Sequence, residues 1–137
     1  MAWTKDKKKG IHHVCLRVPD LHRTAEFYRQ GLGAKLVVEW GKEGGLDHAF
    51  ILDLGAGDFL EIFASPEDFG TGKWQHVAVL TDDIQASVAK AIAAGAELIQ
   101  EPRESHIPTR SGEIVGMKFS FIRAPGGETV EFIQNID

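Results

Sequence analysis

The sequence contains one pattern twice, and a duplicated pattern restricts the fold to one built from two similar units. Residues 13–21 read HVCLRVPDL and residues 76–84 read HVAVLTDDI, with a histidine seven residues before an aspartate in both. Residues 57–63 and 127–133 form a second matching pair, in which a glycine precedes a glutamate by four residues. Each copy therefore contributes one histidine and one glutamate at equivalent positions.

Each copy has the pattern of a β-α-β-β-β unit, which predicts an α+β protein. The predicted parts are a flexible arm over residues 1–9, a first module over residues 10–64, a linker over residues 65–73 and a second module over residues 74–137. In the first module we predict strands over residues 11–18, 34–40, 47–54 and 58–64, and a helix that Asp20 caps and Gly31 ends. In the second module we predict strands over residues 74–80, 97–100, 117–123 and 129–136, and a helix between Asp83 and Gly95.

Residues 101–116 form the longest predicted loop, and a long loop in a compact domain is often a lid or a binding loop. His106 in this loop and His48 on the third strand are candidates for substrate contact. His12 is expected at a strand edge, away from the cavity face, and His22 is expected to be exposed in the first turn of a helix.

Side chains alternate between the two faces of a strand. On each of four predicted strands, one face is purely apolar and suits burial under a helix. The other face mixes polar and apolar side chains, and it suits the wall of a cavity. His13, Glu61, His76 and Glu131 all fall on the second kind of face.

Two imidazoles and two carboxylates make a neutral donor set for a divalent first-row metal. We therefore predict that His13, Glu61, His76 and Glu131 bind nickel, cobalt, zinc, manganese or iron. A metal that chelates two neighbouring substrate oxygens acidifies the adjacent C–H bond, because it stabilises the charge that develops. Glu131 or Glu61 is then placed to carry the proton.

Four further side chains are candidates for substrate binding. Arg17 shares the face of His13 and is a candidate for binding a carboxylate or phosphate, with a surface salt bridge as the alternative. Cys15 is expected to fill space in the pocket. Phe63 and Phe119 are expected in the pocket wall or in the core.

Composition restricts the partners. The net charge of −5 is not the footprint of a nucleic-acid or anionic-membrane binder. No apolar run approaches the roughly 20 residues that cross a bilayer, and no apolar stretch of a signal peptide follows the N-terminal lysines. A single cysteine fits a reducing compartment. We therefore expect a cytoplasmic protein with a small-molecule substrate and no nucleic-acid or membrane partner.

The motifs resemble the vicinal oxygen chelate superfamily, which includes glyoxalase I, methylmalonyl-CoA epimerase, extradiol dioxygenases, fosfomycin-resistance proteins and bleomycin-binding proteins. The resemblance covers residues 11–136 and lies in His13-Val14, Pro19-Asp20-Leu21, Phe27-Tyr28, Leu32-Gly33, Leu60-Glu61, His76-Val77, Asp83-Ile84, Gly127 and Val130-Glu131. It implies two tandem βαβββ modules that form a curved mixed sheet around a metal. The family ligand positions carry over as His13, Glu61, His76 and Glu131.

Within the superfamily, a glutamate at the position of Glu61 is the glyoxalase I pattern, whereas the epimerase often has glutamine there. Arg17 sits where glyoxalase I has an arginine that contacts glutathione. The resemblance thus implies a lactoylglutathione-lyase-like reaction, in which the hemithioacetal of a 2-oxoaldehyde becomes a thioester through a metal-bound enediolate, with Glu131 or Glu61 as the base. Glutathione or another thiol would be the co-substrate. A homodimer is also implied, because several relatives exchange modules between two chains.

The sequence departs from the glyoxalase I pattern after Glu61. Residues 62–70 lack the asparagine-containing segment that helps to hold glutathione, and residues 124–127 read APGG instead of the usual turn sequence. The alternatives are an epimerase or another metal-assisted isomerase, an extradiol-type dioxygenase, and a metal-free ligand-binding protein of the bleomycin-resistance kind. The complete set of metal-type side chains argues against the last of these.

Overall fold

The structure, a computed structural model, describes residues 9–125 and 129–136, so the predicted N-terminal arm lies outside the described residues except for Lys9. The elements are β1 (Gly10–Val18), α1 (Leu21–Leu32), β2 (Lys35–Trp40), β3 (Ala49–Asp53), β4 (Phe59–Ala64), the 3-10 turn η1 (Gly70–Lys73), β5 (Trp74–Leu80), α2 (Ile84–Ala93), β6 (Glu97–Pro108), β7 (Ile114–Arg123) and β8 (Thr129–Asn135). Both halves of the chain therefore have the βαβββ order. The division of the chain at a linker over residues 65–73 stays a prediction.

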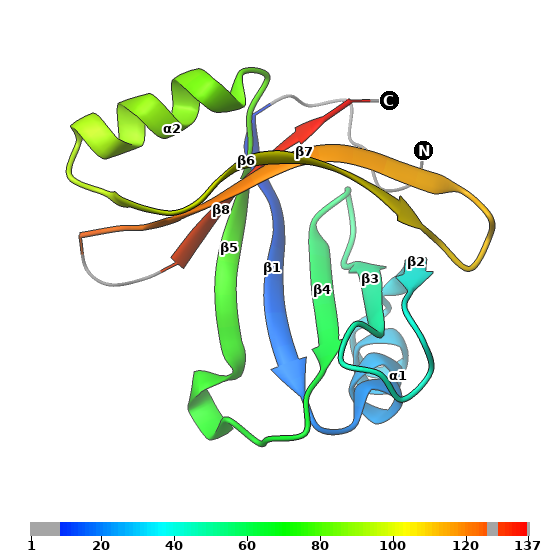
Figure 1. The fold of residues 1–137 in the computed structure, drawn as a ribbon. Helices are drawn as coiled ribbons and strands as arrows, with labels where there is room; N and C mark the ends of the chain where they lie inside the picture. The colour runs from blue at the N-terminus through cyan, green and yellow to red at the C-terminus, as the bar shows by residue number, and fades with distance from the viewer. Residues whose placement is uncertain (1–8, 126–128, 137) are drawn as a thin grey trace.

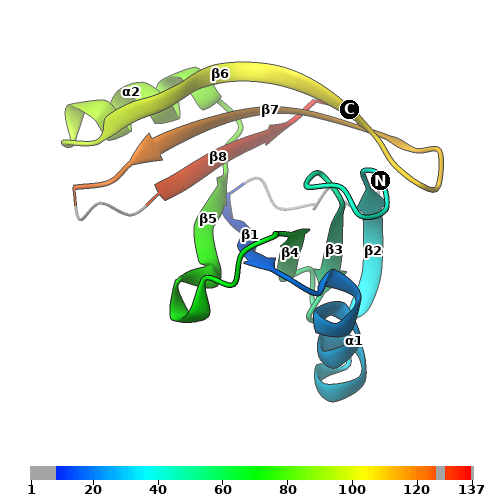
Figure 2. The ribbon, with the colours of Figure 1, turned by 60° about the horizontal axis from the view of Figure 1, so that its bottom comes forward.

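The eight strands form one mixed sheet in the order β2-β3-β4-β1-β5-β8-β7-β6. β1 runs parallel to β4 and β5 runs parallel to β8, while the two halves meet where β1 pairs antiparallel with β5. The sheet curls, so that β6, β7 and β8 arch over the strands of the first half, and α1 and α2 lie on its outer side (Figures 1 and 2). The predicted α+β fold with a curved mixed sheet is confirmed.

Both helices begin at the predicted caps. The side chains of Asp20 and Asp83 accept backbone hydrogen bonds at 3.1 and 3.0 Å from the first turns of α1 and α2. α1 ends at Gly33, which has a φ of 73°, and not at Gly31 as predicted. The left-handed conformation that terminates the helix favours glycine, and it falls at the second of the two glycines.

Two apolar clusters fill the two faces of the sheet. The cluster under α1 belongs to the first half and contains Leu16, Val18, Leu21, Ala25, Ala34, Phe50, Leu52, Leu60 and Ile62. The cluster on the concave face takes residues from both halves: Val38, Trp40, Ala49, Ile51, Phe59, Ala78, Leu80, Val115, Met117 and Ile133. Because the second cluster spans both halves, its burial holds them together as one body.

The predicted loop over residues 101–116 is wrong. β6 continues to Pro108 and β7 starts at Ile114, so most of this segment is a long hairpin. β6 lies at the edge of the sheet, where most of its side chains are exposed or half-buried and where a proline, which has no backbone donor, is tolerated. Because of the exposure and the proline, residues 101–108 lack the alternating apolar pattern by which a strand is predicted from sequence. The tip of the hairpin reaches back to the first half, where the Arg110 N–H donates to the Glu39 carbonyl at 2.9 Å.

Candidate metal centre

The pairing register explains how the sequence brings the four candidate ligands together. In one row across the sheet, His13 pairs with Phe59 on one side and with Ala78 on the other, and Ala78 pairs in turn with Glu131. Cross-strand partners point to the same face of a sheet. His13 and Glu131 therefore share the concave face with the apolar cluster.

A second row lies two residues further along β1. Cys15 pairs with Glu61 of β4 and with His76 of β5. Because the side-chain period of a strand is two residues, this row faces the same side as the row that contains His13. Four strands thus supply one ligand-type side chain each, two from each half of the chain.

The four side chains converge. Nε2 of His13 lies 3.2 Å from Oε1 of Glu61 and 3.2 Å from Oε1 of Glu131. Nε2 of His76 lies 3.0 Å from Oε1 of Glu131 and 4.0 Å from Oε1 of Glu61. The two Nε2 atoms are 3.3 Å apart. Ligand atoms of His13, His76 and Glu131 all lie within 4.8 Å of one another, and Glu61 joins them through its contacts with both histidines.

Burial makes the charges of this cluster costly unless they are paired. His13, Glu61 and Glu131 are buried, and His76 is half-buried. Burial opposes the charged form of His13, but the carboxylates of Glu61 and Glu131 outweigh it and raise the pKa of His13 to about 10. Burial also opposes the charged form of Glu131, but hydrogen bonds from His13 and His76 outweigh it and lower its pKa to about 2. Without a metal, the centre is thus held by an imidazolium–carboxylate pair.

The donor set fits a divalent transition metal. Nitrogen and oxygen donors bind such an ion at about 2.0–2.2 Å, and neighbouring donors in an octahedral shell then lie about 3.0 Å apart. The separations between 3.0 and 4.0 Å in this cluster are close to that value. Two carboxylates beside two imidazoles also neutralise the charge of the ion. The residues that would hold such an ion are His13, Glu61, His76 and Glu131.

Of the four predicted substrate-binding residues, Cys15 lies beside this cluster, and Phe63 and Phe119 pack on the same concave face. Cys15 is buried between Glu61 and His76, and burial together with the Glu61 carboxylate raises the pKa of its thiol well above the ordinary value. Arg17 is half-buried, with its guanidinium carbon 4.8 Å from the centre of the Phe63 ring. Phe63 and Phe119 are both partly buried and pack against the apolar cluster of the concave face. Their contact with a substrate stays a prediction.

Of the other histidines, His12 and His106 differ from expectation. His12 was expected at a strand edge, but it is fully buried, and its Nδ1 lies 2.9 Å from Nδ1 of His13. The register of β1 and β5 shifts between Ile11 and His13, so strict alternation fails there and both rings are buried. His106 is exposed on β6 rather than in a loop. His22 is exposed, as expected, whereas His48 is buried.

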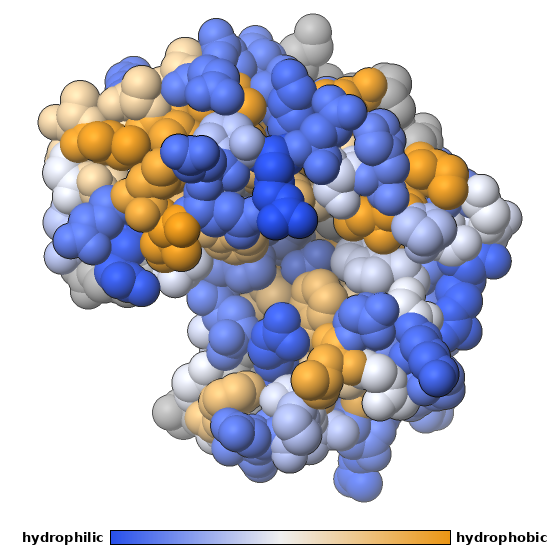
Figure 3. Space-filling view, viewed as in Figure 1, coloured by the Kyte–Doolittle hydropathy of each residue, from blue (hydrophilic) through white to orange (hydrophobic). Residues whose placement is uncertain are grey.

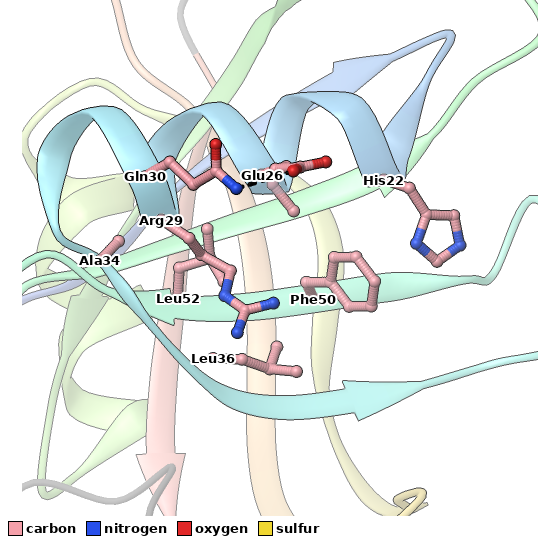
Figure 4. Close-up of a pocket in the computed structure, with 9 residues that line it drawn as sticks. His22, Glu26, Arg29, Gln30, Ala34, Leu36, Phe50 and Leu52 are labelled. Atoms are coloured by element: carbon pink, nitrogen blue, oxygen red, sulfur yellow. Dashed lines mark hydrogen bonds between the residues drawn. The ribbon is translucent and has the colours of Figure 1, made fainter.

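Two cavities lie away from the ligand cluster, whereas a third includes His76 of the cluster in its lining. A cavity of about 480 Å³ lies between α1 and strands β2 and β3, with the side chain of Arg29 reaching across it above Leu36 (Figure 4). Figure 3 shows the molecule hollowed beneath the arch of β6, β7 and β8. A cavity of about 390 Å³ lies between β5 and the start of β8, and His76 of the cluster is among its lining residues. Its walls include Val14 and Val77, which the register places on the face opposite the cluster. Of the helices in the described residues, neither α1 nor α2 is long and apolar enough to cross a membrane.

Comparisons with known proteins agree with this architecture. The family model of the Glyoxalase/Bleomycin resistance protein/Dioxygenase superfamily matches residues 10–132. The chain is 33% identical over 144 residues to lactoylglutathione lyase GLX1 of Arabidopsis thaliana, which covers 98% of the chain and 47% of that relative. It is 33% identical over 130 residues to the uncharacterized protein YwbC of Bacillus subtilis (strain 168), which covers 92% of the chain and 98% of that relative. It is 30% identical over 134 residues to a probable lactoylglutathione lyase of Vibrio cholerae, with 91% and 90% covered.

The chain spans about half the length of the plant relatives that it matches. Among solved structures, the methylmalonyl-CoA epimerase of Mycobacterium tuberculosis superposes with a TM-score of 0.71 at 20% identity, covering 98% of this chain and 93% of the other. This likeness concerns the fold. The family match over nearly the whole chain and the relatives at 30% identity or more lead to one conclusion: the chain belongs to the Glyoxalase/Bleomycin resistance protein/Dioxygenase superfamily.

Proposed function

We propose that the chain is a metal-dependent lyase of the glyoxalase I type, which isomerises the hemithioacetal of a 2-oxoaldehyde and a thiol to a thioester. The observation that carries the proposal is that His13 and His76 each place Nε2 within 3.0–4.0 Å of an oxygen of both Glu61 and Glu131. The names of the relatives in Arabidopsis thaliana and Vibrio cholerae support the same reaction. A bound divalent ion would supply the Lewis acidity that makes the substrate C–H bond acidic.

The glutamates would move the proton. In the net reaction, a proton leaves the carbon that bears sulfur and oxygen and is delivered to the neighbouring carbon, so one group must act first as base and then as acid. Glu131 is held by both histidines, and Glu61 contacts His13 closely but lies 4.0 Å from His76. Either carboxylate is placed for this role, and it is regenerated at the end of the cycle. Burial of the pair keeps bulk water from exchanging with the proton in transit.

Arg17 would bind the anionic part of the thiol. Its guanidinium lies over the ring of Phe63. This contact would fix the orientation of the guanidinium plane toward a carboxylate of the thiol. Cys15, Phe63 and Phe119 would form the wall beside the reacting carbons. Glutathione is the first thiol to test, because two relatives named above are lactoylglutathione lyases by name.

The proposal includes a homodimer in the cytoplasm, as the family resemblance implies. The four candidate ligands come from one chain, so a second copy is not needed to complete the donor set. Light scattering coupled to size-exclusion chromatography measures the oligomeric state. A single species of twice the chain mass of 15.1 kDa is expected.

The test is an activity assay after metal exchange. The protein is stripped with a chelator and reloaded separately with nickel, cobalt, zinc, manganese or iron, and each form is supplied with methylglyoxal and glutathione. At least one form is expected to produce thioester, followed by its ultraviolet absorbance, and the stripped protein is expected to produce none. Exchange of the α-hydrogen of methylmalonyl-CoA by the same forms, without thioester production, would replace the lyase by the epimerase alternative.

A further inference from the structure

A second group of metal-type side chains lies outside the centre described above. It comprises His22 in the first turn of α1, Glu39 at the end of β2, Glu43 in the connection to β3, and His48 just before β3. His22, Glu43 and His48 each offer a ligand atom, and these atoms all lie within 4.8 Å of one another. None of these residues belongs to the four-strand cluster of His13 and Glu131. The group is therefore a separate feature of the fold.

Glu43 lies between the two imidazoles. One of its oxygens, Oε1, is 2.6 Å from Nε2 of His22, and the other, Oε2, is 3.6 Å from Nε2 of His48. Oε2 of Glu39 lies 2.7 Å from the same nitrogen of His48. Both histidines thus direct Nε2 to carboxylate oxygens. Two imidazoles and one or two carboxylates form the donor set that zinc, cobalt and nickel accept.

The burial of His48 distinguishes this group from an ordinary surface ion pair. Its side chain is 2% exposed, whereas those of His22 and Glu43 are 60% and 62% exposed. A buried imidazole in a fixed position is a preorganised ligand, and the two exposed groups can adjust around an ion. Among the residues that the structure describes, the exposed pair of His106 and Glu104, with Nε2 and Oε2 2.9 Å apart, is not part of a group of three metal-type side chains, so it serves as the natural comparison.

The connection between β2 and β3 is tightly shaped around this group. Gly41 has a φ of 85°, and a Cβ at this position would lie 2.1 Å from the carbonyl oxygen of Asp47. Only glycine permits this close approach of the two ends of the connection. The turn therefore brings Glu43 back to His48, with Oε2 3.6 Å from Nε2.

One cation already contacts the two carboxylates and offsets one of their two charges. The guanidinium of Arg110, at the tip of the β6–β7 hairpin, places Nη1 3.4 Å from Oε2 of Glu39 and Nη2 3.7 Å from Oε2 of Glu43. Nη2 also donates to the carbonyl of Gly41 at 2.9 Å. With neutral imidazoles, the two carboxylates and Arg110 leave one negative charge at the group. Arg110 therefore occupies the position of a counter-ion and would compete with a metal.

The group also has an open side. His22, Glu43 and His48 line a cavity of about 340 Å³, and His22 lies at the end of the larger cavity shown in Figure 4 as well. Such space admits water or a small anion as further ligands of an ion. An ion here would have protein ligands on one side and exchangeable ligands on the other.

We infer that His22, Glu43 and His48 form a second site for a divalent transition metal, with Glu39 as a further ligand in reach and Arg110 as the resident counter-ion of the metal-free state. The site is independent of the proposed lyase function, because it shares no residue with the first centre. Its ion would tie α1 to the β2–β3 connection and would displace Arg110 of the hairpin tip.

The experiment is a zinc titration of the tag-free, chelator-treated protein by isothermal titration calorimetry. The wild-type chain is expected to bind two ions, and His22→Gln and Glu43→Gln are each expected to bind one. Arg110→Gln is expected to bind two, with the weaker ion held at least about fivefold more tightly, because a competing positive charge is gone. His106→Gln, the matched exposed histidine, is expected to behave like wild type.

Failure of this proposal and failure of the first centre give different results. If the first centre does not bind zinc, the wild-type chain binds one ion and His22→Gln binds none. Nitrogen NMR of the imidazoles adds a readout without mutation, since zinc should shift the Nε2 signals of His22 and His48. Equal stoichiometry in wild type and His22→Gln, with both signals unmoved, would overturn the second site.

Discussion

The ring nitrogens of His13 and His76 face each other at 3.3 Å, Nε2 to Nε2, although one histidine comes from each half of the chain. Two facing ring nitrogens can share one proton at most, and both also approach Oε1 of Glu131. A cation among them satisfies all three groups at once. The relationship explains why a duplicated βαβββ unit, with one histidine and one glutamate in each copy, produces one centre rather than two.

The first prediction concerns the two glutamates. Glu131→Gln and Glu61→Gln each replace a carboxylate by an amide, which cannot take up a proton. The variant that lacks the base is expected to lose about 10²–10⁴-fold in kcat, whereas the other is expected to lose mainly bound metal. Steady-state thioester formation, with the metal content of each variant measured alongside, distinguishes the two. Wild-type turnover in both variants would remove proton transfer from this centre.

The second prediction concerns protons released on metal binding. The raised pKa of His13, about 10, means that the metal-free protein keeps this imidazole protonated at pH 7. A metal ligand must be neutral, so binding displaces that proton, and the affinity is expected to rise as the pH increases toward 10. Calorimetry in buffers of different ionisation enthalpy counts the protons. Binding without proton release at pH 7 would mean that His13 is not a ligand.

The third prediction concerns the reactivity of Cys15. The thiol is 1% exposed, and burial beside the Glu61 carboxylate raises its pKa, so little thiolate forms and reagents cannot reach it. The native protein at pH 8 is expected to react with a disulfide reagent at least about 100-fold more slowly than the protein in denaturant. Absorbance of the released thiolate follows both reactions. Fast reaction of the native protein would place Cys15 at an open surface instead of inside the centre.

The fourth prediction separates substrate binding from chemistry. Arg17→Lys keeps a positive charge but loses the planar group that lies over the Phe63 ring. KM for the thiol adduct is expected to rise about tenfold with little change in kcat, because Arg17 would bind the thiol part and not the reacting carbons. Arg23→Lys, at an exposed position of α1, is the matched control. An unchanged KM in Arg17→Lys would assign the anion to another residue.

Local signals in the sequence were sufficient for most elements and for the strand face that carries the four candidate ligands. Asp20 and Asp83 are cap residues whose effect is confined to the first helical turn, and both helices begin there. The face of each strand follows from alternation alone, so His13, Glu61, His76 and Glu131 were assigned to one side correctly. The duplication then indicated that the histidine and glutamate of one copy belong with those of the other, although the strand order was unknown.

The remaining features depend on contacts between distant segments. Burial of His12 follows from the register shift between β1 and β5, which no single strand reveals. The hairpin over residues 97–123 contains β6, a polar edge strand with a proline. Beyond residue 100, the sequence of β6 does not identify it as a strand, but its pairing with β7 does. The convergence of His22 and His48 requires both the packing of α1 on β3 and the turn at Gly41.

The most direct test of the account is an anomalous-scattering map of crystals grown with nickel or zinc. The account predicts one strong peak on the concave face, with Nε2 of His13 and His76 and the carboxylates of Glu61 and Glu131 at about 2.0–2.2 Å from it. A map at saturating metal with no peak among these four side chains, or with the side chains turned away from it, would contradict the account.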